Sequence, residues 1–497
     1  MSELYGMVRA AIRPAAFVFM GLALAMVACV GLTSLFAFAG LEQRAMDSAA
    51  VLHMFQASAV AGILGGLAWH WSRSVAHEGL SRREAILSVN LIWIGAVFLG
   101  SLPYLFSGAL GPVDALFEST SGFTTTGATV VADIEGTLPQ TVLLWRSLTQ
   151  WLGGMGIVVL FVAILPQVGI GGKHMFQMEM PGHDPKGFRP RVRETGVILW
   201  RLYLGFTLTE FAVLMVLGVS PFESLNHAFT TMATGGFSTR SASIGGFGNP
   251  VVEWAIIGFM ILGGINFTLY FLALRDRDFS VFLHNAELRV YGVLLVLITA
   301  VVTVSTLGLY PQQPFTALRH AAFMVVSLLT STGYGVGDYS QWPAICLGLV
   351  VLMMVMGGCS GSTSGGLKIG RVMILTVTNW VVVQRHARPK RVHQARIDNV
   401  VVNERTTDQA AAVGLAFVLT LFISTVLFAA LSGAPMETSF GAMLSTTANM
   451  GPAPFHIGAD NFASYPAAAK SVGIIGMVLG RLEFLTVLAL FTRAMWR

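Results

Sequence analysis

Ten stretches of this chain are each long and apolar enough to cross a lipid bilayer as a helix. The hydrocarbon core of a bilayer requires about 20 consecutive apolar residues in a helix. The ten stretches run near residues 14–40, 50–71, 85–105, 139–165, 196–218, 251–274, 286–308, 343–380, 409–432 and 471–492. Of the 497 residues, 54% are hydrophobic and 11% are charged, whereas soluble domains carry roughly 25% charged residues. A water-soluble globular protein is therefore excluded, and we predict an all-α polytopic membrane protein with ten transmembrane helices.

Basic residues gather in every second loop between these stretches. They are Arg73, Arg82 and Arg83, then Lys173, Lys186, Arg189, Arg191 and Arg193, then Arg275 and Arg277, and finally Lys368, Arg371, Arg385, Arg388, Lys390, Arg391 and Arg396. Since short basic loops stay in the cytoplasm, both termini are expected there, and the acidic loops that hold Asp114 and Glu118 are expected outside. The net charge of +5 is too small for so long a chain to suggest nucleic-acid binding.

A motif recurs four times in the outer loops. Each copy begins with a proline, at Pro112, Pro221, Pro314 and Pro435, and reaches a Ser/Thr/Gly cluster 15 to 19 residues later. Proline at the first helical position and an acidic residue in the first turn are helix-start signals. Each copy is therefore expected to form a half-length helix that runs inward. Two spans separate successive copies, so all four copies have the same orientation and form an internal repeat.

Each copy ends in a glycine: Gly127, Gly236, Gly333 and Gly451. Irregular backbone at membrane depth is tolerated only where protein buries it or where it lines a watery cavity. Four copies that share one orientation can meet this condition by facing one another around an axis. Their carbonyl groups then point at a common centre, where they can replace the water shell of a cation. The repeat therefore predicts four pseudo-symmetric units, each a helix, a pore helix and a helix, around a central ion pore.

These residues resemble the Trk/Ktr/HKT superfamily of potassium transporters, and within it the TrkH type. The resemblance is carried by Ser121-Gly-Phe-Thr-Thr-Thr-Gly127, Thr234-Gly-Gly236-Phe-Ser-Thr, Ser331-Thr-Gly333-Tyr-Gly, Gly357-Gly-Cys-Ser-Gly-Ser-Thr-Ser-Gly-Gly366 and Gly480-Arg481-Leu-Glu483. It implies two extra amino-terminal helices in residues 1–80. The four pore units then occupy residues 81–175, 176–280, 281–400 and 401–497.

The resemblance also implies a selectivity filter and an ion. Its potassium ligands would be Thr125, Thr126, Gly127, Thr234, Gly235, Gly236, Ser331, Thr332, Gly333, Asn449, Met450 and Gly451. In plant relatives, a serine in place of the first filter glycine accompanies sodium preference. All four positions are glycine here, which favours potassium. The fourth segment departs most from the pattern because Asn449 and Met450 supply no hydroxyl group.

The resemblance further implies potassium uptake across the bacterial inner membrane by a homodimer. A cytoplasmic nucleotide-binding ring of the TrkA type would regulate it, and the potassium ion is transported rather than held as a cofactor. One alternative is a sodium-selective or sodium/proton-coupled symporter of the same superfamily. A more distant alternative is a polytopic membrane enzyme, which would need an acid/base cluster at one depth. No such cluster stands out as the glycine segments do, and we expect no enzymatic activity.

A dense glycine and serine run interrupts the eighth apolar stretch and is expected to break the helix there. We interpret it as an intramembrane gate, as in the family, and a close-packed helix interface is the alternative. The gate residues are Gly357, Gly358, Ser360, Gly361, Ser362, Thr363, Ser364, Gly365 and Gly366.

Three further basic features lie in or beside the predicted spans. Arg481 is an intramembrane charge that we interpret as a barrier to cations beside the gate, and the alternative is a structural pair with an acid such as Glu483. Arg146 interrupts the fourth span and is expected in a buried pair or in packing. The basic loop from Arg385 to Arg396 would orient the chain, bind anionic membrane lipid or dock a regulator.

Overall fold

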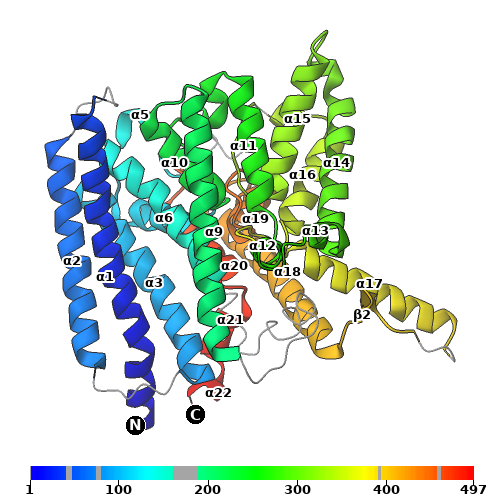
Figure 1. Cartoon of the computed structure of the whole chain (residues 1–497), viewed down its shortest axis with the longest axis horizontal. Helices are drawn as coiled ribbons and strands as arrows, with labels where there is room; N and C mark the ends of the chain where they lie inside the picture. Colours follow the sequence, from blue (N-terminus) through cyan, green and yellow to red (C-terminus); the bar gives the residue numbers. More distant parts are fainter. Residues whose placement is uncertain are drawn as a thin grey trace.

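The structure is a computed structural model that describes residues 2–40, 47–73, 80–159, 188–337, 339–389, 393–455 and 461–496. Almost all regular structure in these residues is helical (Figure 1). The long helices are α1 (Ser2–Phe38), α2 (Ser48–Ser72), α3 (Arg82–Phe106), α6 (Gln140–Val159), α9 (Phe188–Val216), α14 (Ala286–Thr306), α17 (Ile369–Ala387) and α18 (Glu404–Ser432). Of the loop residues used to predict orientation, Lys173, Lys186, Lys390 and Arg391 lie outside the described residues.

Six helices of the described chain are long and apolar enough to cross a membrane without a break. They are Leu4–Phe38, Ser48–Ser72, Arg82–Phe106, Gly196–Val216, Ala286–Leu309 and Glu404–Ser432. Large apolar side chains such as Leu24 and Val296 lie exposed on them, as lipid-facing residues do. Six of the ten predicted spans therefore correspond to unbroken helices.

Two predicted spans are sharply bent. Helix α11 (Pro250–Gly263) meets α12 (Phe267–Asp276) at 82°, and α20 (Ala467–Arg481) meets α21 (Leu485–Leu488) and η6 (Ala489–Phe491) at 101°. At the first break the Asn266 side chain caps α12 by accepting from the Thr268 amide at 2.8 Å. At the second, Glu483 and Phe484 both adopt a positive φ. The prediction of continuous helices over 251–274 and 471–492 was wrong, because these local groups end each helix early.

Of the two remaining predicted spans, one is in two pieces and the other is described only in part. The 343–380 stretch consists of α16 (Ala344–Met356) and α17, with residues 357–368 between them in non-helical conformation. We call residues 357–368 the glycine-rich loop. The 139–165 stretch begins as α6, and its end lies outside the described residues. Counting each bent pair as one span, eight candidate spans are found in the described chain.

Four short helices follow α3, α9, α14 and α18. They are α4 (Pro112–Phe123), α10 (Pro221–Met232), α15 (Pro314–Leu329) and α19 (Met436–Thr447). Three begin at a proline, and Pro435 precedes the fourth. The four expected short helices are therefore confirmed, and an acidic residue stands in the first turn of α4, α10 and α19 but not of α15.

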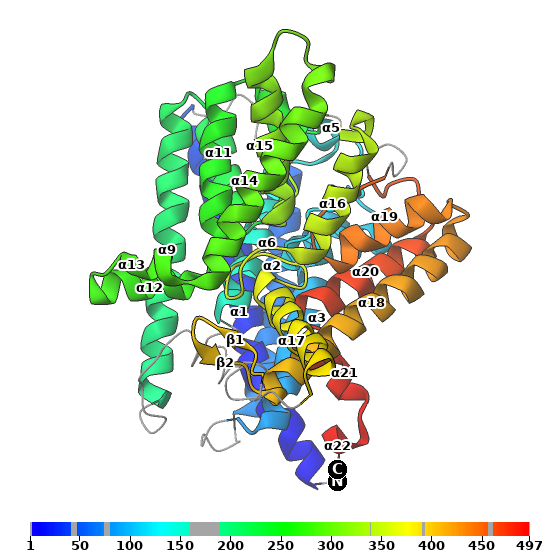
Figure 2. The ribbon, with the colours of Figure 1, turned by 90° about the vertical axis from the view of Figure 1, so that its right-hand side faces the viewer.

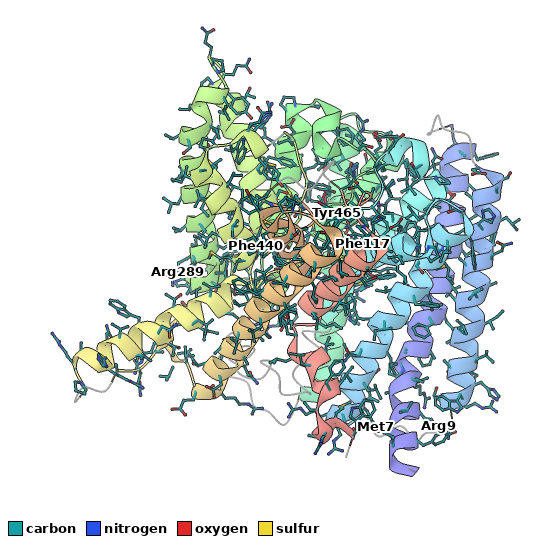
Figure 3. All side chains as sticks on the ribbon, turned by 180° about the vertical axis from the view of Figure 1, so that it is seen from behind. Met7, Arg9, Phe117, Arg289, Phe440 and Tyr465 are labelled. Carbon is teal, nitrogen blue, oxygen red and sulfur yellow. The ribbon has the colours of Figure 1, made fainter. Side chains whose placement is uncertain are left out.

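Two large apolar clusters meet at these short helices. One gathers buried residues of α1, α2, α3 and α6, and the other gathers residues of α11, α14, α15, α16 and α18. Helix α4 contributes Phe123 to the first and Phe117 to the second. Figure 3 shows Phe117 beside Tyr465 in the middle of the molecule, and both rings contact Phe462. The short helices thus lie at the centre of the protein and not at its lipid-facing rim.

The remaining elements are short. They are α5 (Ile134–Thr137), η3 (Ser243–Phe247), α13 (Ser280–His284), η4 (Leu307–Leu309), η5 (Tyr339–Gln341), α22 (Arg493–Trp496) and the strands β1 (Arg396–Ile397) and β2 (Val400–Val401). The strands pair antiparallel around the two-residue turn Asp398–Asn399. Helix α17 extends away from the main body, and the two chain ends lie at the same end of the molecule (Figures 1 and 2).

The contact between α1 and α2 depends on one glycine. A methyl group on Gly65 would lie 2.8 Å from Met20 Cγ and 3.1 Å from the Ala16 carbonyl oxygen. We expect Gly65→Val to lower the free energy of unfolding by about 1–3 kcal/mol, the usual effect of overpacking. Gly66→Val is the matched control, because a methyl group there meets no heavy atom within 4 Å. Thermal unfolding in detergent measures both, and equal destabilisation would contradict this packing.

Candidate functional site

All four short helices end in the same hydrogen-bonded motif. The second residue past each helix has a left-handed backbone, with φ of 50° at Thr125, 50° at Thr234, 58° at Ser331 and 53° at Asn449. The amide of the following residue then bonds the carbonyl five residues back, in Thr126→Ser121 (2.9 Å), Gly235→Thr230 (2.8 Å), Thr332→Ser327 (2.8 Å) and Met450→Ser445 (3.0 Å). This is the Schellman ending of a helix, which usually places glycine at the left-handed position. Here none of the four residues is glycine.

The four glycines of the repeat lie next to one another in a closed ring. Gly127, Gly236, Gly333 and Gly451 have φ of 83°, 78°, 81° and 83°. A methyl group on each would approach a carbonyl oxygen of the next segment: Gly127 that of Gly235 (2.3 Å), Gly236 that of Thr332 (2.0 Å), Gly333 that of Met450 (2.2 Å) and Gly451 that of Thr126 (2.8 Å). The fourth segment faces the first again, so the four segments surround one point. We call these residues the glycine ring.

The side chains just before the ring glycines are buried, and those of Thr126, Thr332 and Asn449 bond protein neighbours, whereas the described chain offers no hydrogen-bond partner to the Thr125 hydroxyl. The hydroxyl of Thr126 lies 2.8 Å from that of Thr124, and the Thr332 hydroxyl lies 2.7 Å from that of Thr330. Asn449 donates to Thr126 Oγ1 at 3.0 Å and to the Met477 carbonyl at 2.9 Å. An amide therefore joins the fourth segment to the first, although that segment carries no hydroxyl.

A buried ion pair lies behind the ring. Arg146 Nε donates to Glu118 at 2.6 Å, and the two side chains are 2% and 0% exposed. Glu118 also accepts from the Thr129 hydroxyl and the Val130 amide, just past the first ring glycine. The expected buried pairing of Arg146 is confirmed. The sequence did not indicate that Glu118 is buried in a pair, because Arg146 is 28 residues away in sequence and only the fold brings them together.

The glycine-rich loop contacts the ends of three short helices. Thr234 Oγ1 donates to Thr363 Oγ1 at 3.1 Å, the Gly365 amide donates to Ser331 Oγ at 2.5 Å, and the Gly366 amide donates to the Ala448 carbonyl at 2.9 Å. Gly357, Gly361 and Gly366 have positive φ, and Gly358, Ser360, Ser362 and Ser364 complete the predicted set within the same loop. The expected break in the helix is confirmed, and the loop lies directly against the ring segments.

Arg481 fastens this loop to α6. Its guanidinium donates to the Thr363 carbonyl at 2.9 Å and to the Gly153 carbonyl at 3.1 Å. Its side chain is buried, and within the described chain no carboxylate lies at ion-pair distance from it. Glu483, the acid considered as its partner, pairs instead with Arg371. Arg481 therefore bonds backbone carbonyls and keeps its charge beside the ring.

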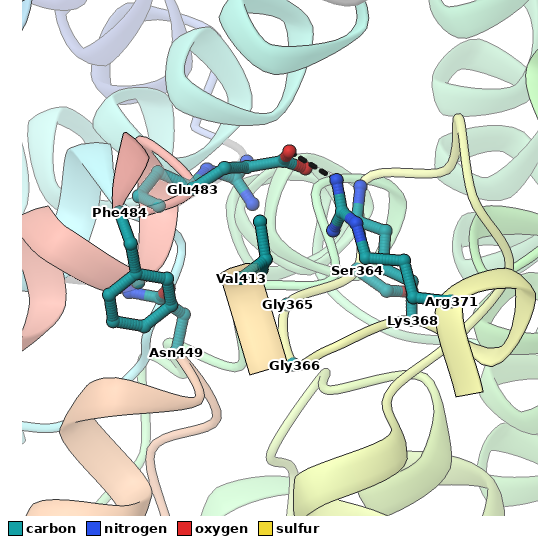
Figure 4. Close-up of a pocket in the computed structure, with 11 residues that line it drawn as sticks. Ser364, Gly365, Gly366, Lys368, Arg371, Val413, Asn449, Glu483 and Phe484 are labelled. Atoms are coloured by element: carbon teal, nitrogen blue, oxygen red, sulfur yellow. Dashed lines mark hydrogen bonds and ion pairs between the residues drawn. The ribbon is translucent and has the colours of Figure 1, made fainter. Parts of the chain in front are cut away.

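A small pocket lies between the loop and the break in the last helix pair. It is lined by Ser364, Gly365, Gly366, Lys368, Arg371, Val413, Asn449, Gly480, Arg481, Glu483 and Phe484. Figure 4 shows Glu483 and Arg371 bonded across it, with Lys368 beside Arg371. Three cationic side chains and one carboxylate surround this space, so its field is positive.

One carboxylate that the sequence analysis missed bonds the glycine-rich loop near its start and the first turn of α17 just past its end. Glu287 Oε1, in the first turn of α14, accepts from the Ser360 amide and the Gly370 amide, each at 2.7 Å. The same turn is bonded to the β-hairpin, since Asp398 accepts from the Ala286 amide at 2.8 Å and pairs with Arg289 at 3.1 Å. Figure 3 shows Arg289 at the end of α14 that lies nearest α17. Nothing local marked Glu287, because its partners lie more than 70 residues away.

Comparison with known proteins gives one consistent result. The family model TrkH, described as a cation transport protein, matches residues 51–496. The chain is 38% identical to the Trk system potassium uptake protein TrkH of Halomonas elongata, over 85% of this chain and 88% of that protein. It is 33% identical to the Trk system potassium uptake protein TrkG of Escherichia coli, over 87% and 89%. It is similar to the crystal structure of the potassium transporter TrkH from Vibrio parahaemolyticus, with a TM-score of 0.88 and 30% identity over 99% of this chain and 100% of that chain.

The Glu287 contacts predict a measurable change in the loop. We expect Glu287→Ala to speed hydrogen exchange of the Ser360 and Gly370 amides by about tenfold or more, since a hydrogen bond to a charged group contributes about 1.5–3 kcal/mol. Glu287→Gln keeps an acceptor oxygen and should give an intermediate rate. Glu404→Ala, at the exposed start of α18, is the control. Unchanged exchange over residues 357–370 in Glu287→Ala would contradict the role of this carboxylate.

Proposed function

Because this chain belongs to the TrkH family of cation transport proteins, we propose that it takes up potassium ions through the glycine ring. It is a multi-pass membrane protein, and its relatives are named as potassium uptake proteins. The observation that carries the proposal is the closed order of the four ring segments, each glycine facing a carbonyl of the next. Carbonyl oxygens gathered in this way replace the hydration shell of a cation.

The filter consists of the twelve residues at 125–127, 234–236, 331–333 and 449–451. This assignment of the filter is supported by the left-handed backbone, which recurs at each ring glycine and at the residue two positions before it. At the ring positions a side chain would collide with a carbonyl of the next segment, and glycine adopts the left-handed angles without steric cost. The hydroxyl groups of Thr126 and Thr332 bond within their own segments, so carbonyl groups are the principal ligands.

Two features support control of ion flow on the side of the filter where the glycine-rich loop lies. The glycine-rich loop bonds the ends of three pore helices, and Arg481 holds it there with a buried positive charge. A dehydrated potassium ion that leaves the filter would meet both. The loop is therefore the gate, and Arg481 is an electrostatic barrier beside it.

The complete architecture has ten transmembrane helices in four pseudo-symmetric units after two amino-terminal helices. Support comes from the four matching pore-helix endings and from the position of both chain ends at one end of the molecule (Figure 2). We place both termini in the cytoplasm of a bacterium, with the protein in its inner membrane as a homodimer. A TrkA-type nucleotide-binding ring regulates it, and the basic residues near the end of α17 face this ring or anionic lipid.

Replacing the first ring glycine tests the filter. We expect Gly127→Ser to lower the potassium-to-sodium permeability ratio at least roughly fivefold, a loss of about 1 kcal/mol, because the new side chain displaces the Gly235 carbonyl. Potassium and sodium fluxes are measured in liposomes, with and without proton and sodium gradients, so that coupled transport is detected in the same experiment. Gly66→Ser is the control outside the ring. An unchanged ratio and flux in Gly127→Ser would count against the filter.

Two variants of Arg481 separate its charge from its hydrogen bonds. If the charge is a barrier, both Arg481→Ala and Arg481→Gln raise potassium flux, roughly tenfold for each 1.4 kcal/mol of barrier removed. If the guanidinium only ties the loop to α6, Gln retains wild-type flux because it can still donate to one carbonyl. Arg388→Ala, at the exposed end of α17, is the control. Reduced flux in folded Arg481→Ala would contradict the barrier.

A further inference from the structure

We infer that Gln150 of α6 is a positioning residue that sets the preference of the second filter segment for potassium over sodium. The inference rests on the proposed function of the glycine ring and deepens it. Neither the repeat nor the ring geometry singles out this residue. The Gln150 side chain is fully buried. In sequence, Gln150 lies more than 80 residues before the segment that it contacts.

Gln150 bonds the backbone of the second segment at two points. Its Nε2 donates to the Gly235 carbonyl at 2.6 Å, and its Oε1 accepts from the Phe237 amide at 3.1 Å. These two groups lie on either side of the ring glycine Gly236. A single side chain therefore fixes the orientation of the backbone that passes through the ring.

The second segment has a glycine where the other three have a side chain. Thr126, Thr332 and Met450 occupy the position before the ring glycine in the other segments, and Gly235 occupies it here. A methyl group on Gly235 would lie 2.4 Å from both Cδ and Oε1 of Gln150. The Gln150 side chain thus fills the space that the missing side chain would take. This explains why two glycines stand together only in this segment.

Arg146, one turn earlier on the same face of α6, extends the contact. Its guanidinium donates to the Ser238 carbonyl at 2.9 Å and lies 3.5 Å from the centre of the Phe237 ring. Glu118 balances its charge. Helix α6 therefore holds backbone groups of residues 235, 237 and 238. In the third and fourth segments a serine of the preceding short helix bonds the backbone, from Ser327 to the Tyr334 carbonyl and from Ser445 to the Gly451 carbonyl. Outside bonds reach these segments two residues past the ring glycine, where Ser243 accepts from the Gly335 amide and Tyr339 donates to the Ala453 carbonyl.

This contact bears on selectivity through the stiffness of the Gly235 carbonyl. Discrimination between potassium and sodium depends on how many carbonyl oxygens surround the ion and how firmly they are held. A carbonyl oxygen has two lone pairs, so one can bond Gln150 while the other faces an ion. Without the amide, the Gly235 carbonyl is free to move toward a smaller ion. Loss of Gln150 therefore favours sodium relative to potassium.

Substitution of Gln150 by methionine tests this role, because it keeps the length of the side chain and removes both hydrogen bonds. We expect the potassium-to-sodium permeability ratio in liposomes to fall about three- to tenfold, given the usual net contribution of a hydrogen bond. Gln140→Met is the matched control on the same helix, since no hydrogen bond of the described chain joins Gln140 to a filter segment. A merely structural role would lower thermal stability and leave the ratio unchanged, which would overturn the inference.

A suppressor pair keeps the test decisive if Gln150→Met does not fold. Gly235→Ala alone should abolish potassium flux, because its methyl group collides with Gln150. Gly235→Ala combined with Gln150→Ala, which empties that space, should recover flux, and no recovery would overturn the inference. A wild-type protein without preference for potassium would refute the proposed function itself. A selective wild type with an equally selective Gln150→Met would refute only the role of Gln150.

Discussion

A helix that ends in the buried interior of a protein leaves backbone groups without partners, and this constraint governs the centre of the molecule. Each unpaired group costs several kcal/mol in lipid. The four short helices meet the constraint with one solution, a left-handed residue followed by a bond five residues back. The left-handed conformation costs about 1–2 kcal/mol at a residue other than glycine. Thr234, Ser331 and Asn449 accept that cost and gain side-chain bonds that glycine cannot make. The endings of the helices therefore also bind the loop and the neighbouring segments.

The sequence was sufficient to predict features that repeat or that stay local. Prolines and glycines at matching distances predicted four short helices that each lead to a glycine. The dense glycine run predicted a break after α16. All of these depend on backbone preferences within a few residues. The sequence was not sufficient for Glu118, Gln150 and Glu287, whose most distant partners lie 28 to 87 residues away. In the sequence, an acidic residue beside an apolar stretch that is exposed to water cannot be distinguished from one that accepts hydrogen bonds from a distant loop. The bends after Gly263 and Arg481 were missed for a related reason, because hydropathy does not reveal where a capping group interrupts a long apolar run.

The four ring segments are similar in backbone and different in support. The first and second depend on α6 and on the Glu118–Arg146 pair, whereas serine hydroxyls within the third and fourth segments bond their own backbone. The fourth segment also reaches the first through Asn449. A filter built from one chain can differ at each quarter in this way, which a ring of four identical subunits cannot. Such differences allow one quarter to change its stiffness while the others keep the geometry of the ring.

The contacts of the glycine-rich loop set a scale for its proposed opening. A net hydrogen bond contributes about 0.5–1.5 kcal/mol, and one to a charged group about 1.5–3 kcal/mol. Shifting an equilibrium from 1:99 to 99:1 requires about 5.5 kcal/mol of differential binding, which is comparable to the few bonds that Ser331, Glu287 and Arg481 make with the loop. If the proposed regulator opens the loop, it must favour the open loop by a similar amount. The described contacts run without interruption from the hairpin through Asp398 and the first turn of α14 to Glu287. Displacement of the hairpin would act, through the first turn of α14, on the carboxylate that bonds the Ser360 and Gly370 amides.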